Sequence, residues 1–391
     1  MRCLDSSPLV EDCIFRDNVA ENKGGGIYAE NATSIVIRDC LFLANTASLG
    51  GGVDCLGPSH PRIENCHFSR NVVGGLGGAV TAEDGAEVSV LSTTLERNRG
   101  GDGGALAVSA SRLTVSACSI RDNVADFGGG ISCLSGTVVV IGCTLSCDTA
   151  SLWGGAMHCL AGSLMTSCST IASNHALTQA GAVNLMSSAG DFDSCEVSDN
   201  TVGESLARDS MCSGFFVQTS TLDVHRSSMY GNGMAIFADA QSGPLPRNVD
   251  ATDNWWGDDS GPYHPVLNPE GLGDRVSDHV DFVPWRDMTP VQEEDVGQWA
   301  RAALLSSSPN PFSAGVDLRF VLRDPAHVRL SIYNARGQLV RDLVQTHSPP
   351  GRISARWDGT AWTGRPEPPG VYFCRLETEG LVISRKIVLV R

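Results

Sequence analysis

The stretch CIFRDNVAENKGGG, Cys13 to Gly26, decides the fold, because recognisable copies of it return along the chain as far as about residue 235. Aligned on the Asn, successive copies start about 25 to 27 residues apart until the last spacing, which is longer. A fixed period in this range indicates stacked supersecondary units, none of which can bury a core alone. The copies are Cys13…Asn18, Cys40…Asn45, Cys66…Asn71, Thr93…Asn98, Cys118…Asn123, Cys143…Asp148, Cys168…Asn174, Cys195…Asn200 and Ser227…Asn232.

The composition of each copy favours strands over helices. The copies are rich in Val, Ile, Thr, Ser and Cys, they are interrupted by Gly and Asn, and none contains a long stretch with helical apolar periodicity. Short alternating runs such as Ser34 to Ile37 and Arg112 to Ser116 are typical of strands. Each unit is therefore predicted to be a coil of about three short strands, and stacked coils form parallel sheets along a solenoid.

Stacking places equivalent residues of successive coils in columns. The Asn column is expected at a turn, where Asn tolerates the left-handed conformation and stacked amides bond to one another. Glycine pairs permit the sharp corner that follows. A second column is expected to point inward, with the thiol as a small apolar filler; it consists of Cys13, Cys40, Cys66, Cys118, Cys143, Cys168 and Cys195.

The glycine-led runs GGGI, GGAV and GGAL alternate with FRDN (Phe15 to Asn18), FLAN (Phe42 to Asn45) and FSRN (Phe68 to Asn71). This pattern resembles the paired repeats of the polymorphic outer-membrane protein family over roughly residues 3 to 285. The resemblance implies a right-handed parallel β-helix, for which we expect about nine to ten coils. By the same resemblance, relatives include adhesins and surface proteins of unknown ligand, and the wider fold includes pectate lyases and polygalacturonases.

The chain is acidic, with a formal net charge of −16 at pH 7. An acidic surface without a basic stripe argues against nucleic acid and anionic membranes as partners. The sequence contains no predicted transmembrane segment and no recognisable export signal. Because Ser7 to Cys13 resembles His60 to Cys66, the chain begins inside a coil. We therefore expect a fragment, or a late start, of a longer secreted protein.

The chain has 14 cysteines. Cysteines of one column on neighbouring coils would lie about 4.8 Å apart with parallel side chains, which suits packing better than bridging. Buried free thiols are therefore predicted. Cys143 and Cys147 with His158 and Cys159 have the residue types of a zinc site, but no CxxC motif accompanies them. No metal and no cofactor are predicted.

The runs that follow the glycine pairs form the face on which a catalytic site would be expected. Calcium-assisted elimination requires several carboxylates and a base, and glycoside hydrolysis requires two carboxyl groups at a defined separation. Glu30 and Asp54, one coil apart, are the only acidic pair in the runs, and a solvated edge explains them; His158 is expected to be inward or partly satisfied. No catalytic residue is predicted. The runs are Ile27 to Glu30, Val53 to Leu56, Ala79 to Ala82, Ala105 to Val108, Ile131 to Leu134, Ala156 to Cys159 and Ala182 to Leu185.

The repeat becomes irregular between residues 201 and 250, where an insertion (Thr201 to Met211) is a candidate ligand-binding loop. The segment from Asp253 to Trp285, with its NWWG string, resembles the closing segment of bacterial secreted β-helix proteins. Trp255 and Trp256 are expected to cover the last coil, with sugar stacking as the alternative role. The β-helix is thus predicted over 1–286, closed by a cap at about 250–286.

Residues 287–307 are predicted to be a linker, and 308–391 a second domain. Alternating runs with Gly turns at roughly ten-residue spacing predict an antiparallel immunoglobulin-like sandwich. The pieces PNPF, IYNARGQLV, WDGTAWTG, PGVYF and RKIVLVR resemble the C-terminal sorting domain of type IX secretion cargo and the immunoglobulin-like domain of flagellar hook-capping proteins. The resemblance implies export across an outer membrane, followed by anchoring or release. An accessory sandwich without a sorting role is the alternative.

Together these observations predict an all-β protein that is secreted by, or attached to the outer surface of, a Gram-negative-type bacterium. The expected function is non-catalytic binding or adhesion, with an extracellular glycan or surface protein as partner and the secretion machinery engaging residues 308–391. A polysaccharide lyase or glycosidase and a passive structural role are the alternatives. The candidate ligand surface consists of Glu30, Asp54, His158, Trp255 and Trp256.

Overall fold

The computed structural model of the chain divides into two compact units, Met1–Val291 and Gln292–Arg391. The described residues form strands, turns and bends, with no α-helix among them. They are residues 1–31, 34–203, 212–239, 249–286, 302–308, 312, 315–322, 326–334, 338–348, 351–362, 365–378 and 381–390.

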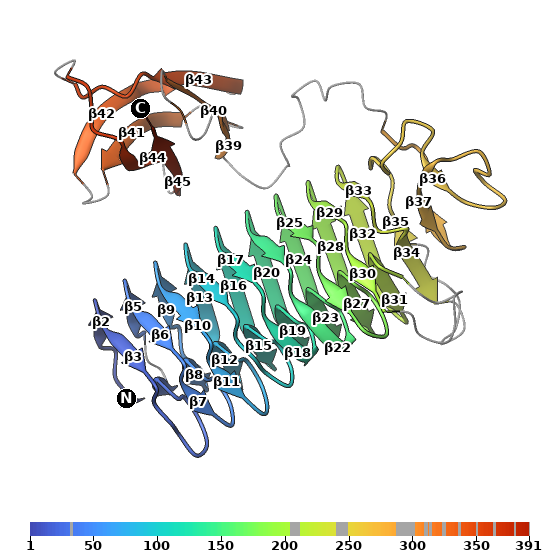
Figure 1. Ribbon diagram of the computed structural model, residues 1–391, viewed down its shortest axis with the longest axis horizontal. Coiled ribbons are helices and arrows are strands. Elements are labelled where there is room, and N and C mark those ends of the chain that lie inside the picture. The colour runs from blue at the N-terminus through green and yellow to red at the C-terminus, as the bar shows by residue number, and fades with distance from the viewer. Residues whose placement is uncertain are drawn as a thin grey trace. The chain divides into compact units, whose positions relative to one another are not determined.

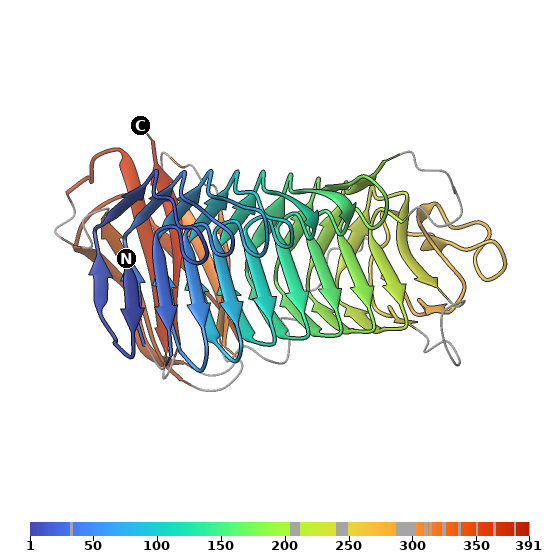
Figure 2. The ribbon, with the colours of Figure 1, turned by 90° about the horizontal axis from the view of Figure 1, so that it is seen from below.

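In the first unit, short parallel strands of successive coils stack into long sheets that run along a solenoid (Figure 1). Figure 2 shows the same stack from below, with the strands of neighbouring coils side by side. Sheet 1 consists, in spatial order, of β1 (Arg2–Leu4), β4 (Ile27–Glu30), β8 (Val53–Leu56), β12 (Val80–Glu83), β15 (Leu106–Ser109), β19 (Ile131–Leu134), β23 (Met157–Leu160), β27 (Val183–Met186), β31 (Phe215–Gln218), β34 (Met234–Asp239), β37 (Gly273–Val276) and β36 (Pro262–Tyr263).

Two further sheets complete the coils. Sheet 2 consists of β2 (Leu9–Glu11), β5 (Val36–Arg38), β9 (Arg62–Glu64), β13 (Glu87–Leu91), β16 (Arg112–Ser116), β20 (Thr137–Ile141), β24 (Ser163–Ser167), β28 (Ala189–Asp193), β32 (Thr221–His225), β35 (Val249–Asp250) and β38 (Val280–Asp281). Sheet 3 consists of β3 (Ile14–Arg16), β6 (Leu41–Leu43), β10 (His67–Ser69), β14 (Thr94–Glu96), β17 (Ser119–Arg121), β21 (Thr144–Ser146), β25 (Thr170–Ala172), β29 (Glu196–Ser198) and β33 (Ser228–Tyr230).

A short arm of each coil, between sheet 3 and sheet 1, carries additional strands. The arm strands are β7 (Thr46–Ala47) with β11 (Val72–Val73), and β18 (Val124–Phe127), β22 (Thr149–Trp153), β26 (His175–Ala176) and β30 (Thr201–Val202). The predicted all-β solenoid of stacked three-strand coils is confirmed, and the arm is an addition that the sequence reading did not separate.

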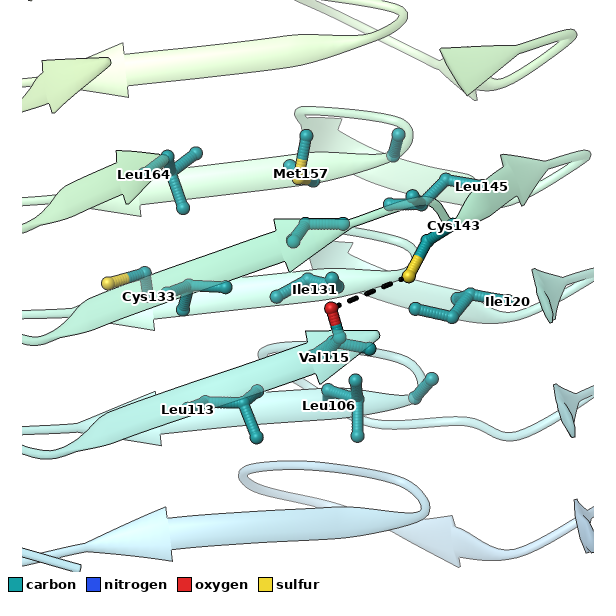
Figure 3. Close-up of a cluster of buried hydrophobic side chains, with 14 of the residues drawn as sticks. Leu106, Leu113, Val115, Ile120, Ile131, Cys133, Cys143, Leu145, Met157 and Leu164 are labelled. Atoms are coloured by element: carbon teal, nitrogen blue, oxygen red, sulfur yellow. Dashed lines mark hydrogen bonds between the residues drawn. The ribbon is translucent and has the colours of Figure 1, made fainter. Parts of the chain in front are cut away.

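Alternate residues of each strand point inward and form one continuous core. Figure 3 shows Leu106, Leu113 and Val115 on one coil, with Ile131 and Met157 on the coils beyond, all within this core. Aromatic side chains stack in register where they recur: the Phe15 and Phe42 rings lie 4.8 Å apart, and the Phe42 and Phe68 rings 4.4 Å apart. The strand register therefore carries each inward residue type to the next coil.

The predicted Asn column forms a hydrogen-bonded ladder. Asn71 donates from its backbone N–H and its side-chain Nδ2 to Oδ1 of Asn98, at 3.0 and 2.9 Å, and from Nδ2 also to the Phe42 carbonyl. The expected left-handed conformation belongs to the preceding residue instead, for example Arg70 with φ of 58° and Arg97 with φ of 55°. This shift turns the corner one residue earlier, so that the Asn side chain points into the stack.

The cysteine column is buried but was assigned partly wrongly. Cys13 occupies the column and packs against the core, although it is half-buried, but Cys168 is exposed. Ser169, which is buried, takes the inward position that was assigned to Cys168, because it is Ser169 that stands five residues before Asn174.

The inward position is also not simply apolar. The Cys118 thiol donates to the Ser116 carbonyl at 3.2 Å and accepts the Thr93 N–H at 3.5 Å. Thr93, Ser169 and Ser227 make the same pair of contacts with their hydroxyl groups. The column therefore requires a small S–H or O–H group, which is why Cys, Ser and Thr alternate in it.

Glycine is required where the coil turns into sheet 1. Gly50 has φ of +57°, and a Cβ at this position would lie 2.6 Å from the Asp54 Cβ and 2.7 Å from the Val53 carbonyl oxygen. Both the conformation and the close approach exclude a side chain here.

The second unit is a small antiparallel sandwich. One sheet contains β39 (Ala302–Ser308), β40 (Val316–Leu322) and β43 (Gly351–Trp357); the other contains, in order, β42 (Leu339–Ser348), β41 (Ala326–Asn334), β44 (Gly370–Thr378) and β45 (Leu381–Leu389). Trp357 and Leu318 from the first sheet share a core with Leu330, Tyr372 and Cys374 from the second. Residues 302–307, assigned to the linker from the sequence, pair with β40 as part of β39. The rest of the predicted linker, 287–301, lies outside the described residues.

Candidate functional site

The outward face of sheet 1 carries a polar column beneath the arms. Asp54 on β8 is in register with Tyr28 on β4 and with Thr81 on β12. These side chains alternate with core residues along their strands, so they point away from the core. Asp54 and Thr81 are nevertheless fully buried. Thr81 shows what covers them, because its hydroxyl donates at 2.9 Å to the carbonyl of Leu76, a residue of its own arm. The column thus lies between the sheet and the arms.

Asp54 is the unusual member of this column. Both of its carboxylate oxygens are buried, and neither has a hydrogen-bond partner among the described residues. Burial raises the pKa of Asp54 to about 7, and the nearby Glu83 carboxylate adds to the shift while Lys23 opposes it. A threonine at this level donates to an arm carbonyl, whereas a carboxylate has no proton to donate. With a pKa of about 7, Asp54 is present in both its protonated and its charged form at neutral pH.

Lys23 and Glu83 complete the cluster. Lys23 lies on the first arm, and its ammonium group forms an ion pair with the Glu83 carboxylate from the end of β12, two coils away. Burial lowers the pKa of Lys23, but the hydrogen bond to Glu83 and the charges of Asp54 and Glu83 outweigh it, so that the pKa is raised. The Lys23 ammonium group therefore interacts with two carboxyl groups, those of Glu83 and Asp54. The Asp54 carboxylate has no hydrogen-bond partner among the described residues.

A hollow of about 690 Å³ adjoins this cluster. The Tyr28 ring forms one wall, with the Arg2 guanidinium 5.6 Å from its centroid, and Lys23 reaches the hollow from the arm. An aromatic face beside amide, hydroxyl and charged groups is the combination with which proteins bind polar ring compounds. The lining residues are Arg2, Glu21, Asn22, Lys23, Tyr28, Ser48 and Leu49.

Glu30, a predicted surface residue, lies at the edge of this region. It is half-buried and forms a 3.4 Å ion pair with Arg2. Its register partner on β8 is Leu56, not Asp54, so the predicted acidic pair is out of register. The carboxyl group that acts on Asp54 is Glu83, which the sequence pattern missed because the third run was placed at Ala79 to Ala82. The strand that is in register with Val53 to Leu56 begins one residue later, at Val80, and ends at Glu83.

His158 is part of the same column, four strands further along sheet 1. It is 2% exposed, its Nδ1 lies 3.1 Å from Asn184 Oδ1, and its ring packs against Phe127 and Trp153 of the arms. Burial lowers the pKa of His158 to about 4, which the Asn184 contact only partly offsets. A neutral, buried imidazole of this kind is a satisfied member of the polar column, which continues to Asn184 on β27, and it presents almost no surface to a ligand.

Trp255 and Trp256 lie at the opposite end of the solenoid from Glu30 and Asp54. Trp256 is fully buried in the solenoid core with Phe282, and Trp285 packs against the same cluster. Trp255 is half-buried against Tyr230, with ring centroids 5.4 Å apart. These contacts are those of a cap. The five candidate residues therefore do not form one site; Glu30 and Asp54 adjoin the hollow, and the others lie elsewhere.

The predicted binding loop and the absence of a predicted metal site are the remaining expectations from the sequence. Of the predicted binding loop, residues 204–211 lie outside the described residues, so the loop stays a prediction. Within the described part of the chain, no group of three or more His, Cys, Asp or Glu side chains is arranged to hold a metal ion. In the same residues, no helix is long and apolar enough to cross a membrane.

Comparison with known proteins supports both units. Residues 4–163 match the family model of the right-handed β-helix region, and residues 310–380 match that of the FlgD Ig-like domain. The chain therefore carries a β-helix region followed by an immunoglobulin-like domain. The β-helix match covers the hollow and the residues around Asp54, but the family includes enzymes and non-enzymes alike and assigns no activity.

A curated relative is the metabotropic glutamate receptor-like protein R of Dictyostelium discoideum, which is 31% identical over 141 residues. The match covers 35% of this chain and 9% of the relative's length. Among solved structures, the dimeric latent PorU of Porphyromonas gingivalis is 26% identical over 24% of this chain and 10% of that chain, with a TM-score of 0.21. A score this low carries no argument about shared structure.

Proposed function

We propose that this protein is a secreted or cell-surface β-helix protein that binds an extracellular glycan on the face of sheet 1. The observation that carries the proposal is the hollow beside the Tyr28 ring. A sugar ring presents an apolar face and a rim of hydroxyl groups. Tyr28 supplies the flat apolar partner, and Asn22, Ser48 and Lys23 supply hydrogen-bonding groups around it.

The exposed Arg2 side chain favours a sugar that carries an acidic group. Lys23, which also lines the hollow, is paired with Glu83, but Arg2 is 64% exposed at its side chain, so its guanidinium is accessible to a carboxylate or sulfate group beside Glu30. Glu21 also lines the hollow and would instead accept bonds from sugar hydroxyl groups. A uronic acid in a polysaccharide satisfies both requirements.

The immunoglobulin-like unit supports the proposed location. Its sequence resembles sorting domains of type IX secretion cargo, and the repeats of the first unit resemble those of polymorphic outer-membrane proteins. We infer that residues 308–391 engage a secretion machinery, so that the protein is anchored on, or released from, the outer surface of a Gram-negative-type bacterium.

Polysaccharide cleavage is a second candidate, which one observation favours. The pKa of Asp54 is raised beside Glu83, and a glycosidase uses one carboxyl group with a raised pKa as acid and a second as base or nucleophile. The arms cover both groups, with Glu83 only 8% exposed, so cleavage also requires an arm to move aside. Binding requires no such movement, which is why we place it first. A passive structural role is the third alternative.

A glycan-array screen of the full chain tests these candidates, with every bound glycan examined by mass spectrometry for new products. The decisive variant is Tyr28→Ala, which should weaken binding at least tenfold. Tyr263→Ala is the matched control, because Tyr263 stacks on Arg275 at 5.7 Å just as Tyr28 stacks on Arg2. Equal affinity of Tyr28→Ala and wild type would exclude the hollow, and a product lost in Asp54→Asn would establish catalysis.

A further inference from the structure

The immunoglobulin-like unit contains a pair of histidines that face each other across two strands. His327 on β41 is in register with His347 on β42. Their ring centroids lie 4.9 Å apart with the planes at 82°. Both side chains are exposed, and both line a hollow of about 580 Å³ together with Arg329, Gln345 and Glu377. This hollow is separate from the glycan site of the first unit.

The spacing of the two rings matches that of two imidazoles on one metal ion. A metal–nitrogen bond of about 2.1 Å, added to the roughly 1.1 Å from a ring nitrogen to its centroid, places the metal about 3.2 Å from each centroid. If the two ring centroids subtend 90° at the metal, they lie about 4.5 Å apart, and if they subtend the tetrahedral angle, they lie about 5.2 Å apart. The observed 4.9 Å lies between these values.

The surroundings suit a divalent cation. Arg329, two residues along β41, lines the same hollow, but its guanidinium is held by both oxygens of Asp342 at 3.1 and 3.2 Å. Its charge is thereby compensated. Glu377 adds a carboxylate to the wall of the same hollow. Volume remains for water molecules to fill the coordination positions that the protein leaves open.

We propose that His327 and His347 chelate a transition-metal ion of the kind that prefers imidazole, namely Cu²⁺, Ni²⁺ or Zn²⁺. The site supplies two protein ligands and leaves the remaining positions to water. His327 is the second residue of β41 and His347 the next-to-last residue of β42. The bound metal therefore clips the open end of these two paired strands and stabilises the unit by mass action.

The test is calorimetric titration of the full chain with CuCl₂, NiCl₂ and ZnCl₂. One ion per chain should bind to the wild type. His327→Ala and His347→Ala should each weaken binding at least tenfold, because chelation fails when either ligand is lost. His60→Ala is the control, since His60 is an exposed histidine on the solenoid, 64% accessible at its side chain; it should bind as the wild type does.

Two readouts separate chelation from folding effects. The electron paramagnetic resonance spectrum of the Cu²⁺ complex should show two equivalent nitrogen ligands in the wild type and fewer in either variant. The metal should raise the melting temperature of the wild type but not that of the two variants. The proposal is overturned if the wild type binds no ion, if either single variant keeps wild-type affinity while folded by circular dichroism, or if His60→Ala loses as much affinity as they do.

Discussion

The side-chain amide of Asn123 donates a 2.9 Å hydrogen bond to Oδ1 of Asp148, the one carboxylate in the ladder between Asn18 and Asn232. The other oxygen of Asp148 is buried without a hydrogen-bond partner. In its place every neighbouring Asn carries an NH₂ group, which donates to the next Oδ1 and to a carbonyl; Asn174, for example, donates to Asn200 Oδ1 and to the Leu145 carbonyl. An aspartate fits here only by holding a proton.

Asp148→Asn should therefore stabilise the solenoid. Burial raises the pKa of Asp148 to about 8, which the bonds from Asn123 only partly oppose. With the folded pKa above the unfolded value, the stabilising protonated form is fully present below about pH 4 and is lost as pH rises through about 8. The variant should gain on the order of a few kcal/mol in unfolding free energy at pH 8 and little at pH 4. Denaturant unfolding at both pH values measures this, and equal gains at both would contradict it. Asp17→Asn is the control, because this aspartate of the first coil is exposed.

Substitutions at Cys118 test the hydrogen-bonding account of its column. Cys118→Ser should be tolerated to within about 1 kcal/mol, because Ser169 and Ser227 fill the same position in other coils. Cys118→Val should cost about 1 to 3 kcal/mol, since it leaves the Thr93 N–H without an acceptor. Cys118→Arg should unfold the neighbouring coils by burying an unpaired charge. Melting curves follow all three, with Cys147→Arg as an exposed control; a Cys118→Arg protein that melts like the wild type would contradict the inward position.

Asp54→Thr copies the residue that follows in the same column. The folded pKa of Asp54, about 7, is above the unfolded value, so the wild type loses stability as pH rises from about 4 through 7. The variant lacks this titration and can donate to an arm carbonyl as Thr81 does. Its unfolding free energy should exceed that of the wild type above pH 7, by an amount on the order of a few kcal/mol, and approach it near pH 4. The pH dependence of urea unfolding decides, with Glu30→Gln on the same sheet as the control.

Sheet 2 carries a row of aspartates on adjacent strands near its C-terminal end. Asp223 is in register with Asp191 on one side and Asp250 on the other, and Asp250 with Asp281. Burial raises the pKa of Asp191, and the charge of Asp223 raises it further. Asp223→Asn should therefore stabilise the protein at neutral pH by about 0.2 to 1 kcal/mol. The gain should shrink at high salt. Urea unfolding at low and high NaCl measures this gain, with Asp12→Asn at an exposed position as the control. If Asp223→Asn instead lowers the stability, the aspartates do not repel one another as expected, and a bound cation would be the explanation.

Trp256→Ala separates the cap from a sugar platform. Trp256 is fully buried in the core, so its truncation should cost about 3 to 5 kcal/mol. Glycan affinity of the protein that remains folded should not change. Melting curves and the glycan screen measure both, and a loss of glycan binding without a loss of stability would reverse the assignment. Trp362→Ala is the control, because this tryptophan of the second unit is 81% exposed.

Periodicity in the sequence determined most of the first unit. The repeat length, the β composition and the Asn and Cys columns follow from residues that recur in step, because a solenoid contacts mainly its sequence neighbours and a column needs no long-range pairing. The sandwich was predicted from alternation and turn spacing in the same way. A stricter alignment on the Asn would have placed Ser169, and not Cys168, in the inward column. The same alignment shows that the residue before each Asn recurs at the corner, where the left-handed conformation is found.

The candidate site depended on tertiary structure. No local pattern shows that the arms fold over sheet 1, so Asp54 was expected at a solvated edge, whereas it is fully buried. His158 is buried, as one of its two expected placements had it, but against the rings of the arms. Lys23 and Glu83 are 60 residues apart and meet only because two coils of stacking intervene between the first arm and β12. The pKa of Asp54 arises from that burial and that neighbour together. The sequence repeat by itself determines which residues stack in a column. The tertiary structure decides which polar groups are buried, because burial depends on how the arms cover sheet 1.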